Sequence, residues 1–230
     1  MKKTIAIKDK IYEYDELTIY LGQGKLNKEI AKDNLLKFRE ILYEKKIYFV
    51  LFYGTLLGAI REEDLISHDQ DIDVFLLESE REKFLKQLFL LRENGFEVAR
   101  YDIRGAISLV RNGEYIDICF FHDYKDNIKR CCTEFFPSYF FDEKIEKKFL
   151  GEKFYIPKKY KEFLLFEYGK NWNIPLEYKY SNFDILLNII MVKIKKITPY
   201  FLKKIFYKLK EKKGREKYEE KLKKFKENMK

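Results

Sequence analysis

Apolar residues repeat along the chain at two spacings, and each spacing predicts one kind of element. Continuous apolar and aromatic runs at 47–53 and 72–77 are typical of buried strands. Before them, four apolar residues follow the spacing i, i+4, i+7 and i+11. This spacing places their side chains on one face of a helix over about 28–45: Ala31, Leu35, Phe38 and Leu42.

Turn and cap signals divide the middle of the chain. The sequence SERE at 79–82 has the form of a capping box and predicts the start of a helix. Asn112 and Gly113 stand between β-prone runs at 107–110 and 115–120, an arrangement typical of a two-residue hairpin turn. Together these elements predict an α+β domain in which helices pack on a mixed sheet.

The last part of the chain alternates apolar residues with lysines. An apolar stripe with helical spacing runs through it, and Pro199 should interrupt that stripe: Ile190, Ile194, Ile197, Phe201 and Ile205. We expect a catalytic domain over 1–182 and a basic, amphipathic helical tail over 183–230. Beyond Gly214 we expect a solvated, lysine-rich coil.

The charge of the chain is uneven. The net charge is +9, but residues 193–230 hold 15 lysines and one arginine against five glutamates, so the remainder is slightly acidic. A nearly neutral body with a basic tail differs from a uniformly basic nucleic-acid binder, and no recognition motif accompanies the tail. We do not expect nucleic acid as a partner. For residues 185–210, contact with anionic lipid and packing on the body both stay open.

Composition and cysteine content indicate the cellular compartment in which we expect the protein. Hydrophobic residues make up 46% and charged residues 37% of the chain, which is typical of a globular protein. Three cysteines, two of them adjacent, do not make a disulfide framework. No apolar run reaches the roughly 18 residues of a membrane span, and the N-terminal apolar stretch is too short for a signal peptide. We expect a cytoplasmic protein with reduced thiols, peripheral on the inner face of the plasma membrane if the tail binds lipid.

The run HDQDIDV at 68–74 holds the first candidate chemistry. Alternate residues of a strand point the same way, so Asp71 and Asp73 should project from one face. Two carboxylates beside apolar residues are costly unless a cation joins them. Mg²⁺ (or Mn²⁺) takes such oxygen ligands together with substrate phosphates. Asp117, the single acid of the apolar run at 115–120, would complete a triad if its strand lay beside the first.

Gly54 and Thr55 follow the predicted strand at 47–53 and should open a short helix. A glycine at such a place lets a phosphate approach the backbone N–H groups of a helix N-terminus. An ordinary tight turn has the same signature. Because the pair stands one strand before the acidic run, it predicts a phosphate contact next to a metal.

Five motifs, in order along the chain, resemble those of one family. GTLLGAIR at 54–61 and HDQDIDV at 68–74 are similar to the GTLLGAxR and PWDDDIDI motifs of the LicD/fukutin-related phosphotransferase family. The similarity continues through YIDI at 115–118, FYIPKKY at 154–160 and YGKNWNIP at 168–175. The resemblance implies a nucleotidyltransferase-like fold. It also implies transfer of a phospho-alcohol, such as phosphocholine or a polyol phosphate, from a CDP-activated donor to a sugar hydroxyl of a glycan acceptor.

The resemblance also implies roles for individual residues. Asp71 and Asp73 inherit a catalytic and metal-binding role, and Asp117, the third carboxylate, is likewise expected to be catalytic and to bind metal. Contact with the donor phosphates falls to three further residues: Gly54, Thr55 and Arg61.

Two positions depart from the family motif. His68 stands where the family usually has Trp, and Gln70 replaces the middle acid. We expect His68 and Asp69 next to the metal ligands, with His68 a proton shuttle, a phosphate contact or a loop residue bonded to backbone. Two other functions use the same carboxylates. One is a nucleotidyltransferase that releases pyrophosphate, and the other is a non-catalytic membrane-surface module whose acids hold a structural cation.

Overall fold

The computed structural model describes residues 2–18, 24–176 and 181–229, and most of its strands form one mixed sheet. Seven strands follow the order β10-β11-β3-β4-β7-β6-β5, and β8 and β9 extend from β7. The pairs β11–β3 and β4–β7 are parallel and the others are antiparallel. The strands are β3 (Val50–Leu51), β4 (Ile72–Leu77), β5 (Glu97–Asp102), β6 (Ala106–Arg111), β7 (Glu114–Lys125), β8 (Ile128–Cys131), β9 (Glu134–Pro137), β10 (Lys144–Phe149) and β11 (Glu152–Pro157).

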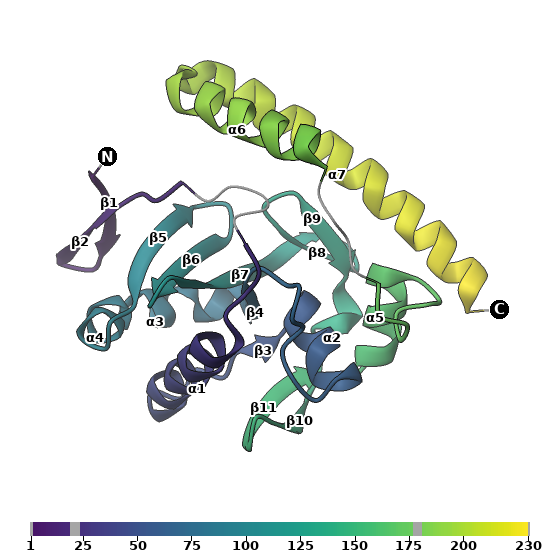
Figure 1. Ribbon diagram of the computed structural model, residues 1–230. Coiled ribbons are helices and arrows are strands. Elements are labelled where there is room, and N and C mark those ends of the chain that lie inside the picture. Colours follow the sequence, from purple (N-terminus) through teal and green to yellow (C-terminus); the bar gives the residue numbers. More distant parts are fainter. Residues whose placement is uncertain (1, 19–23, 177–180, 230) are drawn as a thin grey trace.

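Helices lie on both sides of this sheet (Figure 1). Helices α1, α3 and α4 cover one face, and α6 and α7 lie on the other side, with α2 and α5 near β3 and β9. A separate hairpin, β1 (Lys2–Ile7) with β2 (Lys10–Asp15), lies beside β5. The predicted α+β fold is therefore confirmed. The helices are α1 (Lys28–Glu44), α2 (Tyr53–Arg61), α3 (Arg81–Leu85), α4 (Leu88–Glu93), α5 (Tyr160–Tyr168), α6 (Asn182–Ile197) and α7 (Tyr200–Asn228).

Helix α1 forms as its apolar spacing predicts. The Asn27 side chain accepts a hydrogen bond from the Ile30 N–H at 3.3 Å and so caps its N-terminus. The predicted face is buried, and the Phe38 ring lies 5.1 Å from that of Phe49 and 6.3 Å from that of Phe84 on α3. These contacts hold α1 and α3 on the same face of the sheet.

The alternation of β7 decides which of its side chains face α1 and α3. The Phe120 ring lies 5.5 Å from Phe84, so Phe120 and the residues in phase with it, Ile116 and Ile118, face those helices. The next residue, Phe121, packs on the opposite face against the rings of Phe52 and Phe136. Asp117 is in phase with Phe121 and therefore projects from the face away from α1.

Most local predictions were right, and the predicted length of one strand was wrong. Strand β4 has the predicted bounds, and Asn112 and Gly113 form the β6–β7 turn with φ of 53° and 87°. The run at 47–53 yields only the two-residue strand β3, because the chain turns at Tyr53, with φ of 38°, into α2. A helix begins at Arg81, as the run at 79–82 predicts, although no capping box forms there. A 3-10 turn, η1 (Glu78–Glu80), leads into α3 there without a side-chain cap.

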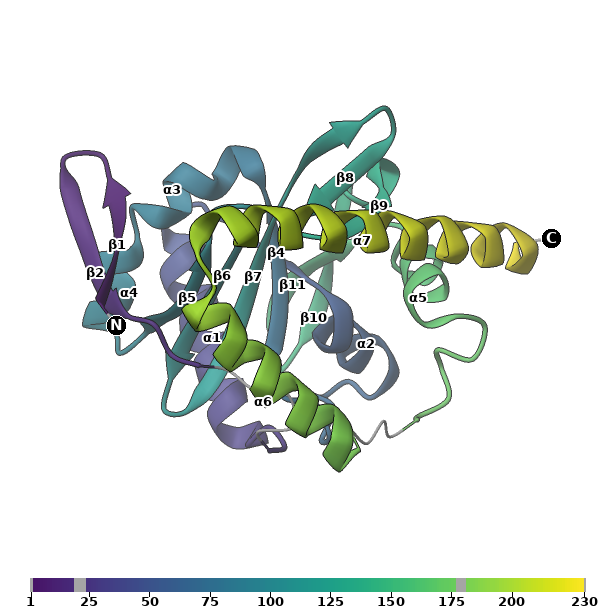
Figure 2. The same ribbon diagram turned by 90° about the horizontal axis from the view of Figure 1, so that it is seen from above.

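The tail is more ordered than its composition predicts. A capping box of Ser181 and Asp184 opens α6, and α7 begins directly after Pro199, as predicted. The expectation of a coil beyond Gly214 was wrong, since α7 continues to Asn228. From above, α7 extends across the sheet towards α5 (Figure 2). The side chains of Ile197 and Phe201 lie outside the described part. No helix in the described ranges is long and apolar enough to cross a bilayer.

Candidate active site

A row of polar side chains crosses four neighbouring strands on the face away from α1. Asp73 of β4 is the register partner of Asp117 of β7, Asp117 pairs with Ser108 of β6, and Ser108 pairs with Arg100 of β5. Register partners of adjacent strands point to the same face, about 4.8 Å apart from strand to strand. The parallel pairing of β4 with β7 therefore brings together two of the predicted carboxylates, 44 residues apart in the chain.

Asp71 joins this row from the segment just before β4. Burial raises the pKa of its carboxyl to about 7, with further contributions from the charges of Asp117 and Asp69, while Arg100 opposes the shift. Burial also raises the pKa of Asp73 well above its usual value, and Asp71 and Asp117 add to the effect. The three predicted carboxylates therefore repel one another where little water reaches them. A bound cation would relieve that repulsion.

Asp117 has two unlike oxygens. Its Oδ2 accepts a hydrogen bond at 2.9 Å from the guanidinium of Arg100, whose Nε also donates to Ser108 Oγ at 3.2 Å. Its Oδ1 is buried and has no hydrogen-bond partner within the described part of the protein. A buried carboxylate oxygen without a partner is unusual, and it marks a position where a cation or a donated proton would be stabilised.

Gly54 and Asp69 lie against each other at the N-terminus of α2. A Cβ built on Gly54 would stand 2.0 Å from Asp69 Oδ2, so the carboxylate occupies the space that any other residue would fill. The Asp69 carbonyl accepts from the Leu26 N–H at 2.8 Å, and its Oδ1 accepts from the Gln70 N–H at 3.1 Å. Glycine is required here for close approach. The neighbour that approaches it in this structure is Asp69.

Thr55 fixes the strand that carries the acids. Its side chain is 1% exposed, and its Oγ1 accepts a hydrogen bond from the Asp73 N–H at 2.8 Å. The Asp73 carbonyl in turn accepts from the Phe52 N–H at 3.0 Å. The GT pair therefore positions Asp69 and Asp73. Contact of Gly54 and Thr55 with a donor phosphate stays a prediction.

Arg61 and His68 lie at the margins of this arrangement. Arg61 Nη1 donates to the Trp172 carbonyl at 3.4 Å, and Nη2 pairs with Glu62 at 2.5 Å, so it joins α2 to the loop after α5. It stands two turns of helix from Gly54. His68 is half-buried, and burial raises the pKa of the adjacent Asp69 carboxyl, an effect that the Gln70 N–H and His68 partly offset. Both expected roles stay predictions.

Arg100 and Ser108 belong to the site although sequence reasoning missed them. The run EVARYD at 97–102 lacks a clean polar–apolar alternation, since Val98 and Ala99 are both buried and the register with β6 shifts between Val98 and Arg100. The sequence therefore offers little signal for this position.

Two tyrosines also border the acids: Tyr53, which is half-buried, and Tyr168, which is partly exposed. Loss of hydration raises the pKa of both phenols, and the charge of Asp73 contributes to both shifts. These phenols stay protonated beside the carboxylates.

The carboxylates of this row, which we call the acidic row, suit a hard cation. They do not form a complete set of protein ligands around one. Among residues 2–18, 24–176 and 181–229, no group of three or more His, Cys, Asp or Glu side chains has the geometry of a ready-made metal site. Arg100 occupies one oxygen of Asp117. Even so, the proximity of the Asp71 and Asp73 carboxylates and the unpartnered Oδ1 of Asp117 favour a bound cation. Mg²⁺ usually takes one or two carboxylates and completes its shell with water and substrate phosphates, which is the number available here.

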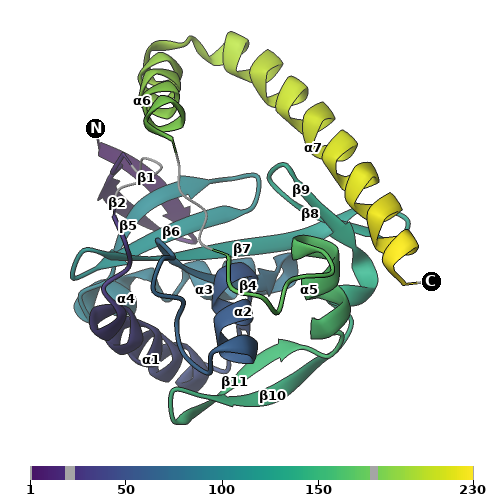
Figure 3. The ribbon, with the colours of Figure 1, turned by 45° about the vertical axis from the view of Figure 1, so that its right-hand side comes forward.

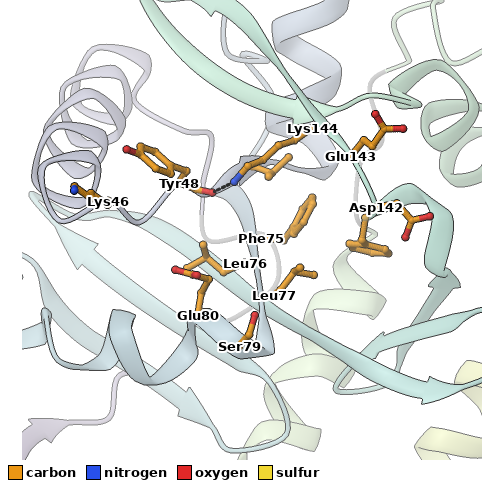
Figure 4. Close-up of a pocket in the computed structure, with 12 residues that line it drawn as sticks. Lys46, Tyr48, Phe75, Leu76, Leu77, Ser79, Glu80, Asp142, Glu143 and Lys144 are labelled. Carbon is orange, nitrogen blue, oxygen red and sulfur yellow. Dashed lines mark hydrogen bonds between the residues drawn. The ribbon is translucent and has the colours of Figure 1, made fainter.

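A separate hollow lies towards the other end of β4. It is lined by Tyr48, Leu77, Glu143 and Lys144, among others (Figure 4). Lys144 Nζ donates to the Tyr48 carbonyl at 2.9 Å across it. None of the predicted carboxylates lines this hollow, and we assign it no part in the chemistry.

The mixed sheet, its helices and the carboxylate row define an α+β domain with an acidic centre. The family model described as LicD/FKTN/FKRP, nucleotidyltransferase domain, matches residues 46–162, which is half of the chain. The chain therefore belongs to this family. An uncharacterized protein of Rickettsia typhi is 27% identical over 104 residues, or 45% of this chain. The match spans 32% of that relative's length.

Solved structures similar to this chain include an adenylyltransferase and an antibiotic-resistance factor. The lincosamide antibiotic adenylyltransferase LnuA with bound lincomycin has 14% identity and a TM-score of 0.43, over 70% of this chain and 95% of that chain. The antibiotic-resistance factor ANT(2'')-Ia in solution has 12% identity and a TM-score of 0.47, over 83% and 94%.

Proposed function

We propose that the chain is a metal-dependent phosphotransferase that moves a phospho-alcohol from a CDP-activated donor to a sugar hydroxyl of a cell-surface polysaccharide. The observation that carries the proposal is the register pairing of Asp73 with Asp117, with Asp71 beside them. Family membership supports the transferase class. The donor and the acceptor are inferred from the motifs.

The proposed reaction is a displacement at phosphorus. The acceptor hydroxyl oxygen forms a bond to the phosphorus that carries the alcohol, and the bond from that phosphorus to CMP breaks. The hydroxyl proton passes to a carboxylate, and the unpartnered Oδ1 of Asp117 supports that residue as acceptor. Asp71 and Asp73 would hold Mg²⁺ or Mn²⁺. When bound, the metal neutralises charge on the phosphoryl oxygens.

The other groups of the site would prepare this reaction without touching the phosphorus. Thr55 holds the backbone of Asp73, and the Asp69 carboxylate lies against the start of α2. Arg100 supplies positive charge beside Asp117. A guanidinium there suits an anionic substrate, because it can donate to phosphate oxygens as it now donates to a carboxylate.

The test uses the full chain with Mg²⁺ or Mn²⁺ and three donors: CDP-choline, CDP-ribitol and CDP-glycerol. We expect one donor with metal to raise the melting temperature, and CMP to appear on a chromatogram when a polysaccharide acceptor is added. Asp71→Asn should lose the CMP signal and keep its fold. Pyrophosphate release from a nucleoside triphosphate would establish nucleotide addition in its place. Absence of any metal or CDP effect would favour the non-catalytic module.

A further inference from the structure

The surroundings of helix α7 differ before and after Gly214. A Cβ on Gly214 would stand 2.1 Å from the Thr133 carbonyl oxygen, so the helix backbone touches the β8–β9 turn there. Further on, Lys221 Nζ pairs with Glu167 of α5 at 2.6 Å, and Phe225 is 7% exposed. The second half of α7 is therefore docked on the body, through residues at helical spacing on one side.

The first half of α7 and the whole of α6 have a different character. Among the described side chains of 183–209, ten large apolar ones are exposed. In α6 they recur at a helical spacing that makes one stripe, and a matching stripe begins α7: Leu187, Ile190 and Ile194, then Leu202, Ile205 and Leu209. Helices α6 and α7 form a helical hairpin, and we call the exposed apolar side chains of 183–209 the hairpin face. An apolar patch of this kind on a globular protein marks an interaction site.

Charge indicates what covers the hairpin face. Residues 181–213 contain nine lysines against one aspartate and one glutamate. Lys193, Lys208 and Lys210 are exposed and alternate with the apolar residues. A second copy of this chain would bring the same positive charge against it, which opposes pairing. An anionic lipid surface offers an apolar region for these side chains and negatively charged headgroups for the lysines.

We propose that α6 and the first half of α7 bind flat on an anionic membrane through the hairpin face. Apolar residues enter the level of the lipid headgroups, and the lysines contact anionic phosphates beside them. Long lysine side chains can reach outwards from such a position while their stems stay in apolar surroundings.

The docked half of α7 gives this contact a fixed orientation. Arg104 stacks on the Tyr207 ring at 3.9 Å, and Arg130 pairs with Glu211 at 2.9 Å, so the body is held close to the middle of α7. The hairpin of helices lies on the side of the sheet opposite α1 (Figure 3), and Asp117 projects to that same side. A bound membrane would therefore lie on the side of the acidic row.

The experiment is vesicle sedimentation with the full chain, using phosphatidylglycerol–phosphatidylcholine vesicles and pure phosphatidylcholine vesicles. We expect binding to the anionic vesicles, at least tenfold weaker binding to neutral ones, and a decrease as salt rises. Leu187→Glu with Ile190→Glu should abolish binding. Melting curves show whether the variants keep the fold, which the exposure of both residues predicts.

Two charge variants give a matched comparison. Lys208→Gln, Lys210→Gln and Lys212→Gln together remove three charges beside the hairpin face. Lys223→Gln, Lys224→Gln and Lys226→Gln remove three exposed charges from the docked half. We expect the first triple variant to bind at least tenfold more weakly and the second to bind nearly as the wild type. Equal loss in both, or no binding to anionic vesicles, would overturn the proposal. So would a lipid-free dimer, seen by sedimentation velocity, that Leu187→Glu converts to a monomer.

Discussion

Asp73 and Asp117 are register partners on the adjacent parallel strands β4 and β7. Strand phase places both carboxylates on the face away from α1, and Asp71 shares their electrostatic field. Like charges at this spacing are unfavourable in the protein alone. Their arrangement is therefore best explained by something they bind, and it yields direct tests.

Asp73→Asn should separate function from folding. Removing one of three crowded carboxylates should cost about 10²-fold or more in CMP release, while the metal-free melting temperature stays equal or rises. Asp123→Asn is the control, because Asp123 lies on the same strand β7 with an 83% exposed side chain. Full turnover in Asp73→Asn would contradict a catalytic role for this row.

The stability of the metal-free protein should depend on Asp71 and pH. The pKa of Asp71 is raised to about 7, whereas an unfolded aspartate titrates near about 4. Between these values the folded state binds more protons, so the free energy of unfolding should fall as pH rises from about 4 to 7. Denaturant titrations in EDTA measure this slope. Asp71→Asn should flatten it, and identical slopes in both proteins would refute the shift.

Arg100→Gln should strengthen metal binding at high pH. Arg100 holds one oxygen of Asp117 at 2.9 Å and competes with a cation for it. At pH 8.5, above the pKa of about 7 of Asp71, we expect Mn²⁺ affinity by calorimetry to rise several-fold. Arg104→Gln is the control, since Arg104 pairs with Asp102 on the neighbouring turn. Weaker binding in Arg100→Gln would show that this guanidinium supports the metal indirectly.

Gly54→Ala should destabilise the protein through Asp69. Alanine normally stabilises a helix by about 1 kcal/mol relative to glycine, but here its Cβ would meet the Asp69 carboxylate at 2.0 Å. We expect a loss of about 1–3 kcal/mol. In an Asp69→Ala background the same change should cost much less, giving a coupling of about 0.5–3 kcal/mol. Additive effects in denaturant titrations would exclude this contact as the cause.

Gly214→Ala tests the docking of α7. The added methyl would stand 2.1 Å from the Thr133 carbonyl oxygen, so we expect destabilisation of about 1–3 kcal/mol where helix propensity alone predicts a gain. Hydrogen exchange of 214–228 should accelerate, while α1 keeps its protection. Unchanged exchange together with a higher melting temperature would show that α7 does not rest on this turn.

Much of the local structure could be predicted from residue types alone. The helical spacing of α1, the bounds of β4 and the turn at Asn112 and Gly113 follow from short-range preferences, and the structure has all three. The run at 47–53 misled, because its composition suits a long strand while the chain turns at Tyr53 into α2. Apolar side chains suit any buried segment, so an apolar run does not distinguish a strand from the loop and helix that follow it.

The acidic run and its phase along one strand were determined by the sequence itself. Alternation predicts that Asp71 and Asp73 lie on the same side of the chain, and Asp71 stands one residue before β4. Only the tertiary structure decided that β7 lies beside β4 in the register that pairs Asp73 with Asp117, that Arg100 arrives from β5, and that Asp69 fills the space over Gly54. Those neighbours depend on long-range packing of strands and helices, which short-range preferences do not specify.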